Sequence, residues 1–296
     1  MLGTRLLVGT GLVALAALVL FVDHQLPPWY PFLLVLLLGL AVISCNELLT
    51  LIDSTRRPTP WLANLAVVGM VAVNWLPHLV YASEPVWTWI FGYFVGIVLL
   101  SFLVEMAAFR EPGTSLNRLA LTVWMAAYIG LLPSFLIQLR WPATFGAPAE
   151  PDYGTAALAL AIFVPKSGDI GAFFTGRFFG RNRMTPLLSP KKTWEGAVGG
   201  ITTAVVATVV NDSVTPAPVL GGLWWAHVGF GATVGCAGLL GDLAESLIKR
   251  DCRQKDAGET VPGFGGVLDV VDAIIFAAPV TFAWCAAVAL AQRGQG

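Results

Sequence analysis

Long apolar runs dominate the chain and are separated by short polar segments. The runs are continuous and lack the polar–apolar alternation of a strand, so they predict helices. Runs of about 18 to 25 apolar residues are long enough to cross the hydrocarbon core of a bilayer. Nine such spans are predicted: Arg5–Val22, Trp29–Leu51, Trp61–Tyr81, Val86–Phe109, Leu116–Leu139, Tyr153–Phe174, Thr193–Val210, Leu220–Leu240 and Val267–Leu290. The sequence therefore predicts an all-α, polytopic integral membrane protein.

Basic residues predict how these spans are oriented. Of the 17 lysines and arginines, Arg140 and Arg293 fall on one side, Lys166 lies inside a span, and all the others fall on the opposite side. Loops rich in lysine and arginine stay in the cytoplasm. With nine spans, this places the N-terminus in the cytoplasm and the C-terminus outside. The first span is expected to be a retained helix, because no small-x-small cleavage site follows it.

Composition supports the membrane assignment and narrows the chemistry. The chain has 296 residues, of which 56% are hydrophobic and 12% charged, whereas a soluble domain carries roughly 25% charged residues. A net charge of −1 gives no case for nucleic-acid binding. Three cysteines (Cys45, Cys236, Cys285) lie in or near apolar segments and are expected to be small core residues, and Cys252 is given no role. The three histidines are scattered, so no zinc site is expected.

The polar residues divide the chain into two parts. Residues 1–150 are expected to be scaffold helices, and residues 151–296 are expected to be a catalytic region with cytoplasmic loops. Glu47 and Glu105 lie near span ends in the first part, where they either meet the membrane interface, the favoured interpretation, or line a cavity. No internal repeat is present, so an inverted-repeat transporter is not supported.

The segment from Ser246 to Asp272 is the most polar stretch between apolar runs. It holds four basic residues, five carboxylates and four glycines. Lysine and arginine bind phosphates, carboxylates bind a divalent metal, and glycine allows the backbone to approach both. A membrane protein does not keep so many ionisable groups beside its spans without a use for them. The combination is typical of phosphoryl or nucleotidyl transfer.

Candidate metal ligands lie at two places, one just before this segment and one at its end. At helical spacing Asp242, Glu245, Ser246 and Lys249 share one stripe, which places a metal ligand and a phosphate ligand two turns apart. The alternative is a solvated face with a Glu245–Lys249 pair. A second group, the aspartates at positions 269 and 272, projects from one helix face after the turn at residues 262–266. These two carboxylates repel unless a cation such as Mg²⁺ lies between them, the alternative being ordinary carboxylates at a helix start. The N–H groups of that glycine turn are expected to line a phosphate site.

Two upstream segments add candidate residues. Lys166 and Asp169 share a helix face inside an apolar run, where Asp169 either lines a polar substrate cavity or forms a structural ion pair. Residues 189–196, S-P-K-K-T-W-E-G, enter the seventh span and offer either an anion site or an ordinary helix cap. No G-x-x-x-x-G-K-[ST] motif is present, so this is not a P-loop.

Together these motifs resemble a known family. The pattern S-x-[apolar]-K-R-x4-K-D-x-G-x2-[apolar]-P-x-x-G-G-[apolar]-x-D-x-x-D, which ends at Asp272, is similar to that of the phosphatidate cytidylyltransferases, or CDP-diacylglycerol synthases. Asp169 in an apolar helix, the G-R-x-F-G run at residues 176–180 and the S-P-K-K-T-W-E-G segment are also similar. The resemblance covers residues 166–272, and the first half of the chain resembles the family only in having many spans.

The resemblance implies that CTP and phosphatidic acid react at the cytoplasmic face to give CDP-diacylglycerol and pyrophosphate. It implies one or two divalent ions, with Mg²⁺ expected and a monovalent ion left open. The implied metal ligands are Asp242, Asp256, Asp269 and Asp272. The implied catalytic residues are Lys249, Arg250, Lys255, Asp256 and Asp272. The implied substrate-binding residues are Asp169, Ser189, Lys191, Lys192, Thr193, Ser246, Gly265 and Gly266.

The resemblance also implies partners and a location, and it has gaps. CTP, phosphatidic acid and the lipid bilayer are the expected partners, nucleic acid is not, and a homodimer is left open. A bacterial plasma (inner) membrane is the expected location of this multi-pass protein. Phe264 stands where a histidine is usual and Val270 where an arginine is usual, which removes two phosphate or headgroup contacts. CTP-dependent transfer to another lipid phosphate or alcohol, an inactive structural homologue and a non-enzymatic anion transporter therefore remain as alternatives.

Overall fold

The fold is all-α apart from one small sheet. The computed structural model describes residues 2–80, 85–110 and 112–293. In these residues, eight helices are long and apolar enough to cross a membrane: Pro31–Leu51, Pro60–Leu79, Val86–Ala108, Ser115–Gln138, Pro151–Phe179, Trp194–Val214, Trp224–Asp251 and Leu268–Arg293. The polytopic all-α prediction is confirmed. A helix, α1 (Leu2–Asp23), also covers the first predicted span, but its described apolar part, Leu7–Asp23, is shorter than the other eight. Whether α1 is a ninth membrane span therefore stays a prediction, and so does the placement of the two termini, which depends on the number of spans.

The chain forms two compact units, which are described separately. The first unit comprises Met1–Ile137 and Cys252–Asp269, and the second comprises Gln138–Asp251 and Val270–Gly296. The glycine-rich segment after residue 251 therefore packs with helices that are distant in the sequence. The predicted functional division near residue 150, into scaffold and catalytic parts, stays a prediction.

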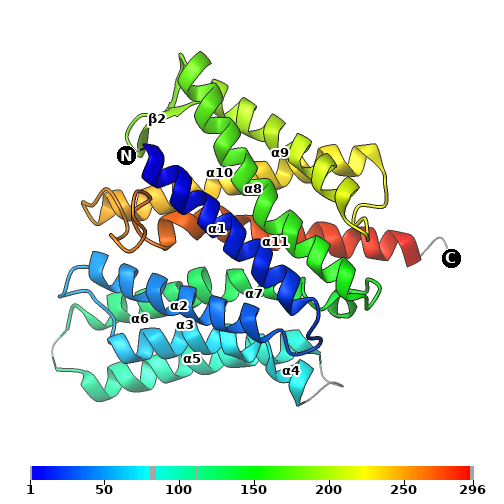
Figure 1. The fold of residues 1–296 in the computed structure, drawn as a ribbon. Helices are drawn as coiled ribbons and strands as arrows, with labels where there is room; N and C mark the ends of the chain where they lie inside the picture. Colours follow the sequence, from blue (N-terminus) through cyan, green and yellow to red (C-terminus); the bar gives the residue numbers. More distant parts are fainter. Residues whose placement is uncertain (1, 81–84, 111, 294–296) are drawn as a thin grey trace. The chain divides into compact units, whose positions relative to one another are not determined.

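The first unit is a helical bundle with a mixed core. Its helices in chain order (Figure 1) are α1, α2 (Pro31–Leu51), α3 (Pro60–Val73), α4 (Leu76–Leu79), α5 (Val86–Ala108), α6 (Ser115–Met125), the π-helical segment η1 (Ala126–Leu131) and α7 (Leu132–Gln138). Buried Met70 of α3 packs with Ile90 of α5. Asn74 Nδ2 donates to Ser134 Oγ at 3.0 Å, so these two buried polar side chains are paired within the core.

The second unit contains the longest helices. Its elements are the 3₁₀ turn η2 (Pro142–Phe145), α8 (Pro151–Phe179), β1 (Arg183–Thr185), β2 (Ser189–Thr193), α9 (Trp194–Val214), α10 (Trp224–Asp251) and α11 (Leu268–Arg293), whose first two residues belong to the first unit. Small residues allow α8 and α9 to approach closely. A Cβ placed at Gly200 of α9, for example, lies 2.9 Å from the Cβ of Ala172 on α8. Close approach through small residues is a common way for helices to associate in lipid.

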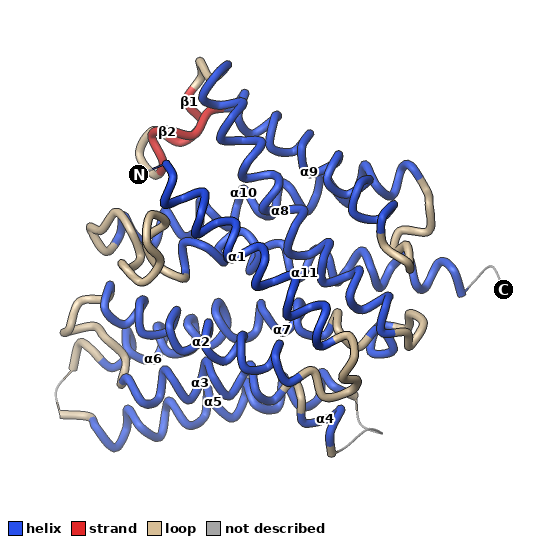
Figure 2. The backbone as a smooth tube through the Cα atoms, in the orientation of Figure 1, coloured by secondary structure: helices blue, strands red, loops and turns tan. Residues whose placement is uncertain are grey.

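Three features of this unit differ from the sequence predictions. Helices α8 and α10 continue to Phe179 and Asp251, well beyond the predicted span ends. The antiparallel strands β1 and β2, red in Figure 2, were not predicted, because their short polar segments show no alternation. Cys236 on α10 is exposed rather than a core residue, whereas Cys45 and Cys285 are buried as expected.

Candidate active site

Three carboxylates of the second unit converge on one point. Asp242 and Glu245 lie on α10 and Asp272 lies on α11, and one carboxylate oxygen from each is within 4.8 Å of the others. Only 1% of Glu245 and 4% of Asp272 is exposed. Three buried or half-buried carboxylates at this separation repel one another unless cations lie close to them. This carboxylate cluster is therefore the strongest candidate metal centre in the described part of the chain.

Small residues in α10 allow the cluster to form. A Cβ placed at Gly241 lies 2.5 Å from the carbonyl oxygen of Asp272, so only glycine lets α10 and α11 approach this closely. One turn earlier, a Cβ at Gly238 lies 3.0 Å from Pro165 of α8 and 3.6 Å from Ala273 of α11. The convergence of α8, α10 and α11 around these two glycines brings the carboxylates together.

Three lysines from different elements form ion pairs with the cluster and with the neighbouring Asp169. Lys166 Nζ on α8 is 3.0 Å from Asp169 and 3.3 Å from Asp272, so the ion pair that was the alternative interpretation of Asp169 is present and Lys166 has a second partner. Lys192 Nζ on β2 is 2.7 Å from Asp242. Lys249 pairs with Glu245 one turn away on α10, and both are buried, so this predicted pair is not on a solvated face.

The donor set fits a divalent cation. With all groups ionised, the three lysines face four carboxylates, so one negative charge remains in excess. Carboxylate oxygens are preferred ligands of Mg²⁺, and in its octahedral site two ligands at about 2.1 Å are about 3.0 Å apart when adjacent and about 4.2 Å apart when opposite. The three oxygens, which lie within 4.8 Å of one another, would therefore draw closer together around a bound ion. Asp242, Glu245 and Asp272 are therefore suited to hold Mg²⁺ together with substrate phosphates.

The strand pair is attached to this part of α10. The Arg250 Nε donates to the carbonyl of Leu188, at the turn between β1 and β2, at 3.3 Å. Thr193 Oγ1 accepts the N–H of Gly196 at 3.1 Å, so Thr193 is the cap of α9, the alternative considered from the sequence. Lys191 is exposed on β2, whereas Lys192 is half-buried against Asp242. Of the basic residues of β2, Lys192 is thus the one placed at the cluster. Substrate binding by Ser189, Lys191 and Thr193 stays a prediction.

Asp169 of α8 and Ser246 of α10, the remaining predicted substrate-binding residues of these helices, differ in their position relative to the carboxylate cluster. Asp169 lies at the edge of the cluster through its pair with Lys166 and is about one third exposed. Ser246 is buried on α10 directly after Glu245. Their contacts with substrate stay predictions.

The other predicted carboxylates, Asp256 and Asp269, belong to the first unit. Asp269 Oδ2 accepts the N–H groups of Ala257 at 2.9 Å and Gly266 at 2.7 Å. Gly265 has φ of +110°, and a Cβ there lies 2.6 Å from Asp269 Oδ2 and 3.4 Å from the Cβ of Asp256. Lys255 and Asp256 are exposed on this segment. The predicted four-aspartate set thus falls into two described groups, Asp242 with Asp272 and Asp256 with Asp269.

Backbone N–H groups of the glycine turn, residues 262–266, form hydrogen bonds within the protein. The N–H groups of Phe264 and Gly265 donate to the carbonyl of Val261, and that of Gly266 donates to Asp269. These donors already serve to close the turn, so the structure does not present them as a phosphate cradle. Phosphate binding by Gly265 and Gly266 stays a prediction. The close approach of protein carboxylates to both positions is a second reason for glycine at this turn.

Three buried or partly buried residues have contacts that the sequence does not predict. Glu245 joins the carboxylate cluster, whereas the sequence predicts only Asp242 of that stripe as a metal ligand, although Glu245 has the same spacing from Asp242 as the aspartates of α11 have from each other. Lys166 was assigned one partner only, because its pair with Asp272 joins residues 106 positions apart. Glu47 is 6% exposed and bonded to residues 260–268, so it lines the protein interior rather than the membrane interface.

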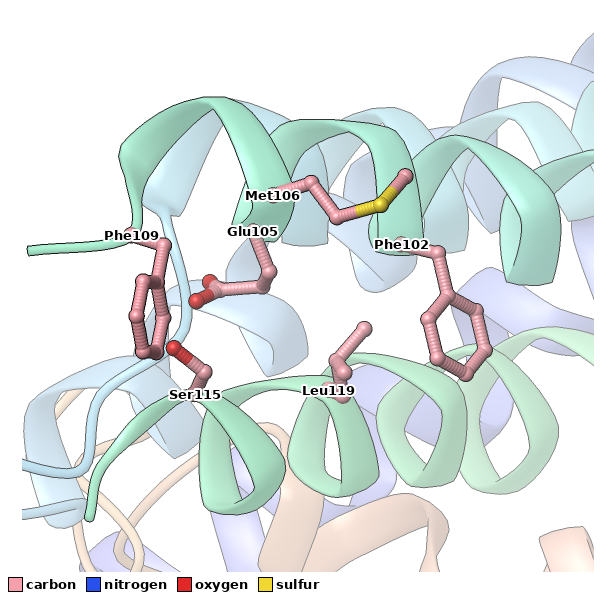
Figure 3. Close-up of a pocket in the computed structure, with 6 residues that line it drawn as sticks. All are labelled: Phe102, Glu105, Met106, Phe109, Ser115 and Leu119. Atoms are coloured by element: carbon pink, nitrogen blue, oxygen red, sulfur yellow. The ribbon is translucent and has the colours of Figure 1, made fainter. Parts of the chain in front are cut away.

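Glu105 also departs from the favoured expectation of an interfacial carboxylate. It is 5% exposed, and its Oε2 is 3.2 Å from Arg118 Nε. Its side chain points toward Ser115 (Figure 3). The two residues line a cavity of about 260 Å³ between α5 and α6. The remaining lining side chains are apolar: Phe102, Met106, Phe109 and Leu119. This cavity lacks the cluster of cations and carboxylates found in the second unit, so it is not the candidate for phosphate chemistry.

Comparison with known proteins places the chain in a family. A model of the cytidylyltransferase family matches residues 3–288. A phosphatidate cytidylyltransferase of Synechocystis is 31% identical over 74% of this chain and 75% of its own length. Phosphatidate cytidylyltransferase 5 of Arabidopsis thaliana chloroplasts is 32% identical over 70% of this chain but only 55% of its own length, and a Mycobacterium bovis phosphatidate cytidylyltransferase is 28% identical over 74% and 78%. With its carboxylate cluster inside the matched region, this chain belongs to the cytidylyltransferase family.

Proposed function

We propose that the protein transfers the cytidylyl group of CTP to phosphatidic acid at the cytoplasmic face of a bacterial plasma membrane. The products are CDP-diacylglycerol, a precursor in phospholipid biosynthesis, and pyrophosphate. The observation that carries the proposal is the cluster of Asp242, Glu245 and Asp272 with three lysines around it, in a chain whose relatives bear the name phosphatidate cytidylyltransferase.

In the proposed reaction a phosphate oxygen of phosphatidic acid attacks the α-phosphorus of CTP. The new P–O bond forms as the bond between the α-phosphorus and its bridging oxygen breaks, and pyrophosphate leaves with the electron pair. No covalent enzyme intermediate is needed, so positioning and charge stabilisation supply the catalysis. Mg²⁺, when bound, neutralises the triphosphate and the departing pyrophosphate.

The protein's own residues would bind and orient the two anions. Asp242, Glu245 and Asp272 would hold the cation, and Asp256 and Asp269 are proposed to assist from the preceding segment. Lys192 and Lys249 already lie against the carboxylates, so each is positioned to move to a phosphate oxygen when a cation takes its place. Arg250 and Lys255 are proposed to bind the outer phosphates.

The lipid that accepts the cytidylyl group has a second candidate besides phosphatidic acid. Phe264, which replaces the family's usual histidine, lies over α1, where a Cβ placed at Gly9 would be 3.4 Å from its ring. An apolar ring cannot donate a hydrogen bond to a phosphate, so a lipid other than phosphatidic acid is the second candidate acceptor.

The test uses full-length protein purified in detergent, with CTP, Mg²⁺ and a panel of lipid phosphates and isoprenoid alcohols. We expect pyrophosphate release that depends on phosphatidic acid, with CDP-diacylglycerol identified by mass spectrometry. Asp272→Asn is expected to lower turnover at least 100-fold. Release that depends on another lipid would replace the acceptor. An absence of release with every lipid would contradict the enzymatic proposal and favour an inactive homologue or an anion transporter.

A further inference from the structure

Glu47 of α2 is a buried carboxylate outside the site described above. Its partners lie more than 200 residues along the chain, in the glycine-rich segment of the same compact unit. Glu47 Oε1 accepts the hydroxyl of Thr260 and the N–H of Val267, the latter at 2.8 Å. Glu47 Oε2 accepts the N–H of Leu268 at 2.9 Å. Both oxygens of one carboxylate are therefore used to hold one turn of the chain.

These N–H groups lie at the start of α11. Leu268 is the first residue of that helix, and the first N–H groups of a helix have no partner within it. A carboxylate also interacts favourably with the positive end of the helix dipole. Helix α11 is thus capped by a residue of α2 rather than by its own N-cap side chain. Hydrogen bonds to an ionised acceptor are stronger than neutral ones, which makes the cap specific for a carboxylate.

Two glycines leave room for this carboxylate. A Cβ at Gly258 lies 2.9 Å from Glu47 Oε1, and a Cβ at Gly266 lies 2.6 Å from Glu47 Oε2. Distances below about 3 Å require a shift of the neighbouring atoms, so neither position accepts a side chain without moving Glu47 or the turn. These two glycines of the motif are therefore explained by a protein carboxylate that approaches the backbone.

The turn that Glu47 holds also carries a candidate metal ligand. Asp269 directly follows Leu268, and its Oδ2 accepts the N–H of Gly266. Glu47 and Asp269 thus bind successive N–H groups, at residues 266–268, with Glu47 reaching the turn from α2. Glu47 therefore contacts the backbone where α11 begins. Asp272 follows one turn later on the same helix.

We propose that Glu47 is a positioning residue for the transfer reaction, which sets the start and rotation of α11 and thereby the direction of the Asp269 carboxylate. This inference rests on the proposed function for its catalytic consequence, whereas the capping geometry is independent of it. Glu47 itself is not proposed to touch substrate or metal.

The experiment compares Glu47→Gln with Glu105→Gln. Glutamine has the shape of glutamate but carries an NH₂ group in place of one oxygen, so at either Val267 or Leu268 a donor would face the backbone N–H in place of the acceptor. Glu105 is the matched control, because it is equally buried in the same unit and its carboxylate pairs with Arg118. The first readout is amide hydrogen exchange of residues 258–268 in full-length protein, and the second is the Mg²⁺ concentration at half-maximal turnover, together with kcat and KM for CTP.

We expect Glu47→Gln to speed exchange at residues 267 and 268 about tenfold, lower kcat about tenfold and raise the half-maximal Mg²⁺ concentration, with a smaller change in KM for CTP. Glu105→Gln should leave exchange in this segment and the Mg²⁺ requirement unchanged. Thr260→Val, which removes one contact of Glu47, should give an intermediate exchange rate. Unchanged exchange in Glu47→Gln would overturn the proposal.

The activity readout also separates a positioning role from a structural one. If Glu47→Gln speeds exchange but keeps the wild-type kcat and Mg²⁺ requirement, Glu47 stabilises the turn without positioning the reaction, and the proposal is overturned. If the wild-type protein shows no turnover with any lipid, the proposed function fails.

In that case the readout that replaces kcat is the rise in melting temperature that Mg²⁺ causes. The proposal stands only if that rise is smaller in Glu47→Gln than in Glu105→Gln, and an equal rise overturns it.

Discussion

Lys166 of α8 forms an ion pair with Asp272 of α11, with 3.3 Å between Nζ and Oδ1, although the two residues are 106 positions apart in the chain. The same ammonium group is 3.0 Å from Asp169 Oδ2. Asp272 is buried and belongs to the carboxylate cluster, so Lys166 holds one of its three candidate ligands in place. This relationship connects the packing of α8 against α11 to the chemistry of the site.

Removal of the Lys166 charge is expected to lower both stability and activity. Loss of one partner of a buried ion pair costs about 3–5 kcal/mol, and the partial exposure of Lys166 reduces this to about 1–3 kcal/mol. Lys166→Met should therefore lower the melting temperature in detergent and reduce turnover more than tenfold. Lys166→Arg should retain more of both, since it keeps the charge. A Lys166→Met protein with the wild-type melting temperature and turnover would contradict this role.

The close approach of α10 and α11 at Gly241 is expected to be essential for the cluster. In Gly241→Ala the new Cβ meets the carbonyl oxygen of Asp272, so the helices must separate. We expect a loss of turnover of at least tenfold, measured as pyrophosphate release. Gly39→Ala on α2 is the control, because a Cβ there has no neighbour within 4 Å and alanine favours a helix. Equal activities of the two variants would show that the approach of α10 to α11 does not matter.

Glu245 is expected to be a metal ligand that the sequence motif alone does not identify. Glu245→Gln removes one negative charge from the cluster and replaces the carboxylate that pairs with buried Lys249 by a neutral amide. The concentration of Mg²⁺ at half-maximal turnover should rise about tenfold or more. Should that concentration stay at the wild-type value while the protein remains folded, Glu245 would be excluded as a ligand.

Neighbouring lysines of β2 are expected to differ in importance. Lys192 lies 2.7 Å from Asp242, whereas Lys191 is exposed. Lys192→Ala should therefore reduce kcat more than Lys191→Ala does, so that the kcat of Lys192→Ala is about tenfold lower than that of Lys191→Ala. Steady-state kinetics with varied CTP measures both. A larger loss for Lys191→Ala would move the phosphate site away from Asp242.

The sequence predicts features that depend on neighbours along the chain. The apolar runs predict eight described spans, because a continuous run of this length has few alternatives to a membrane helix. Helical spacing places Lys166 with Asp169, and Glu245 with Lys249, on shared faces, since residues three or four apart are neighbours there, and the ion pairs that it offers as alternatives are both present. The small strand pair escapes prediction because Ser189–Thr193 is short and polar, and backbone N–H groups at residues 181–182 are held by Glu195.

Contacts between distant segments could not be predicted from spacing. Nothing local in the sequence pairs Lys166 with Asp272 or Glu47 with Leu268, because both pairs depend on how helices pack. Glu47 near the end of an apolar run resembles an interfacial residue until its partners are known. The sequence therefore identifies the chemical groups of the candidate site, while packing decides which of them meet.

Binding of Mn²⁺ in place of Mg²⁺, followed by electron paramagnetic resonance in detergent, tests the central claim most directly. The wild-type protein is expected to bind Mn²⁺ stoichiometrically, and the triple variant Asp242→Asn, Glu245→Gln and Asp272→Asn is expected to lose that binding while keeping its helical content by circular dichroism. A folded triple variant that binds Mn²⁺ as tightly as the wild-type protein would contradict a metal centre at these three carboxylates.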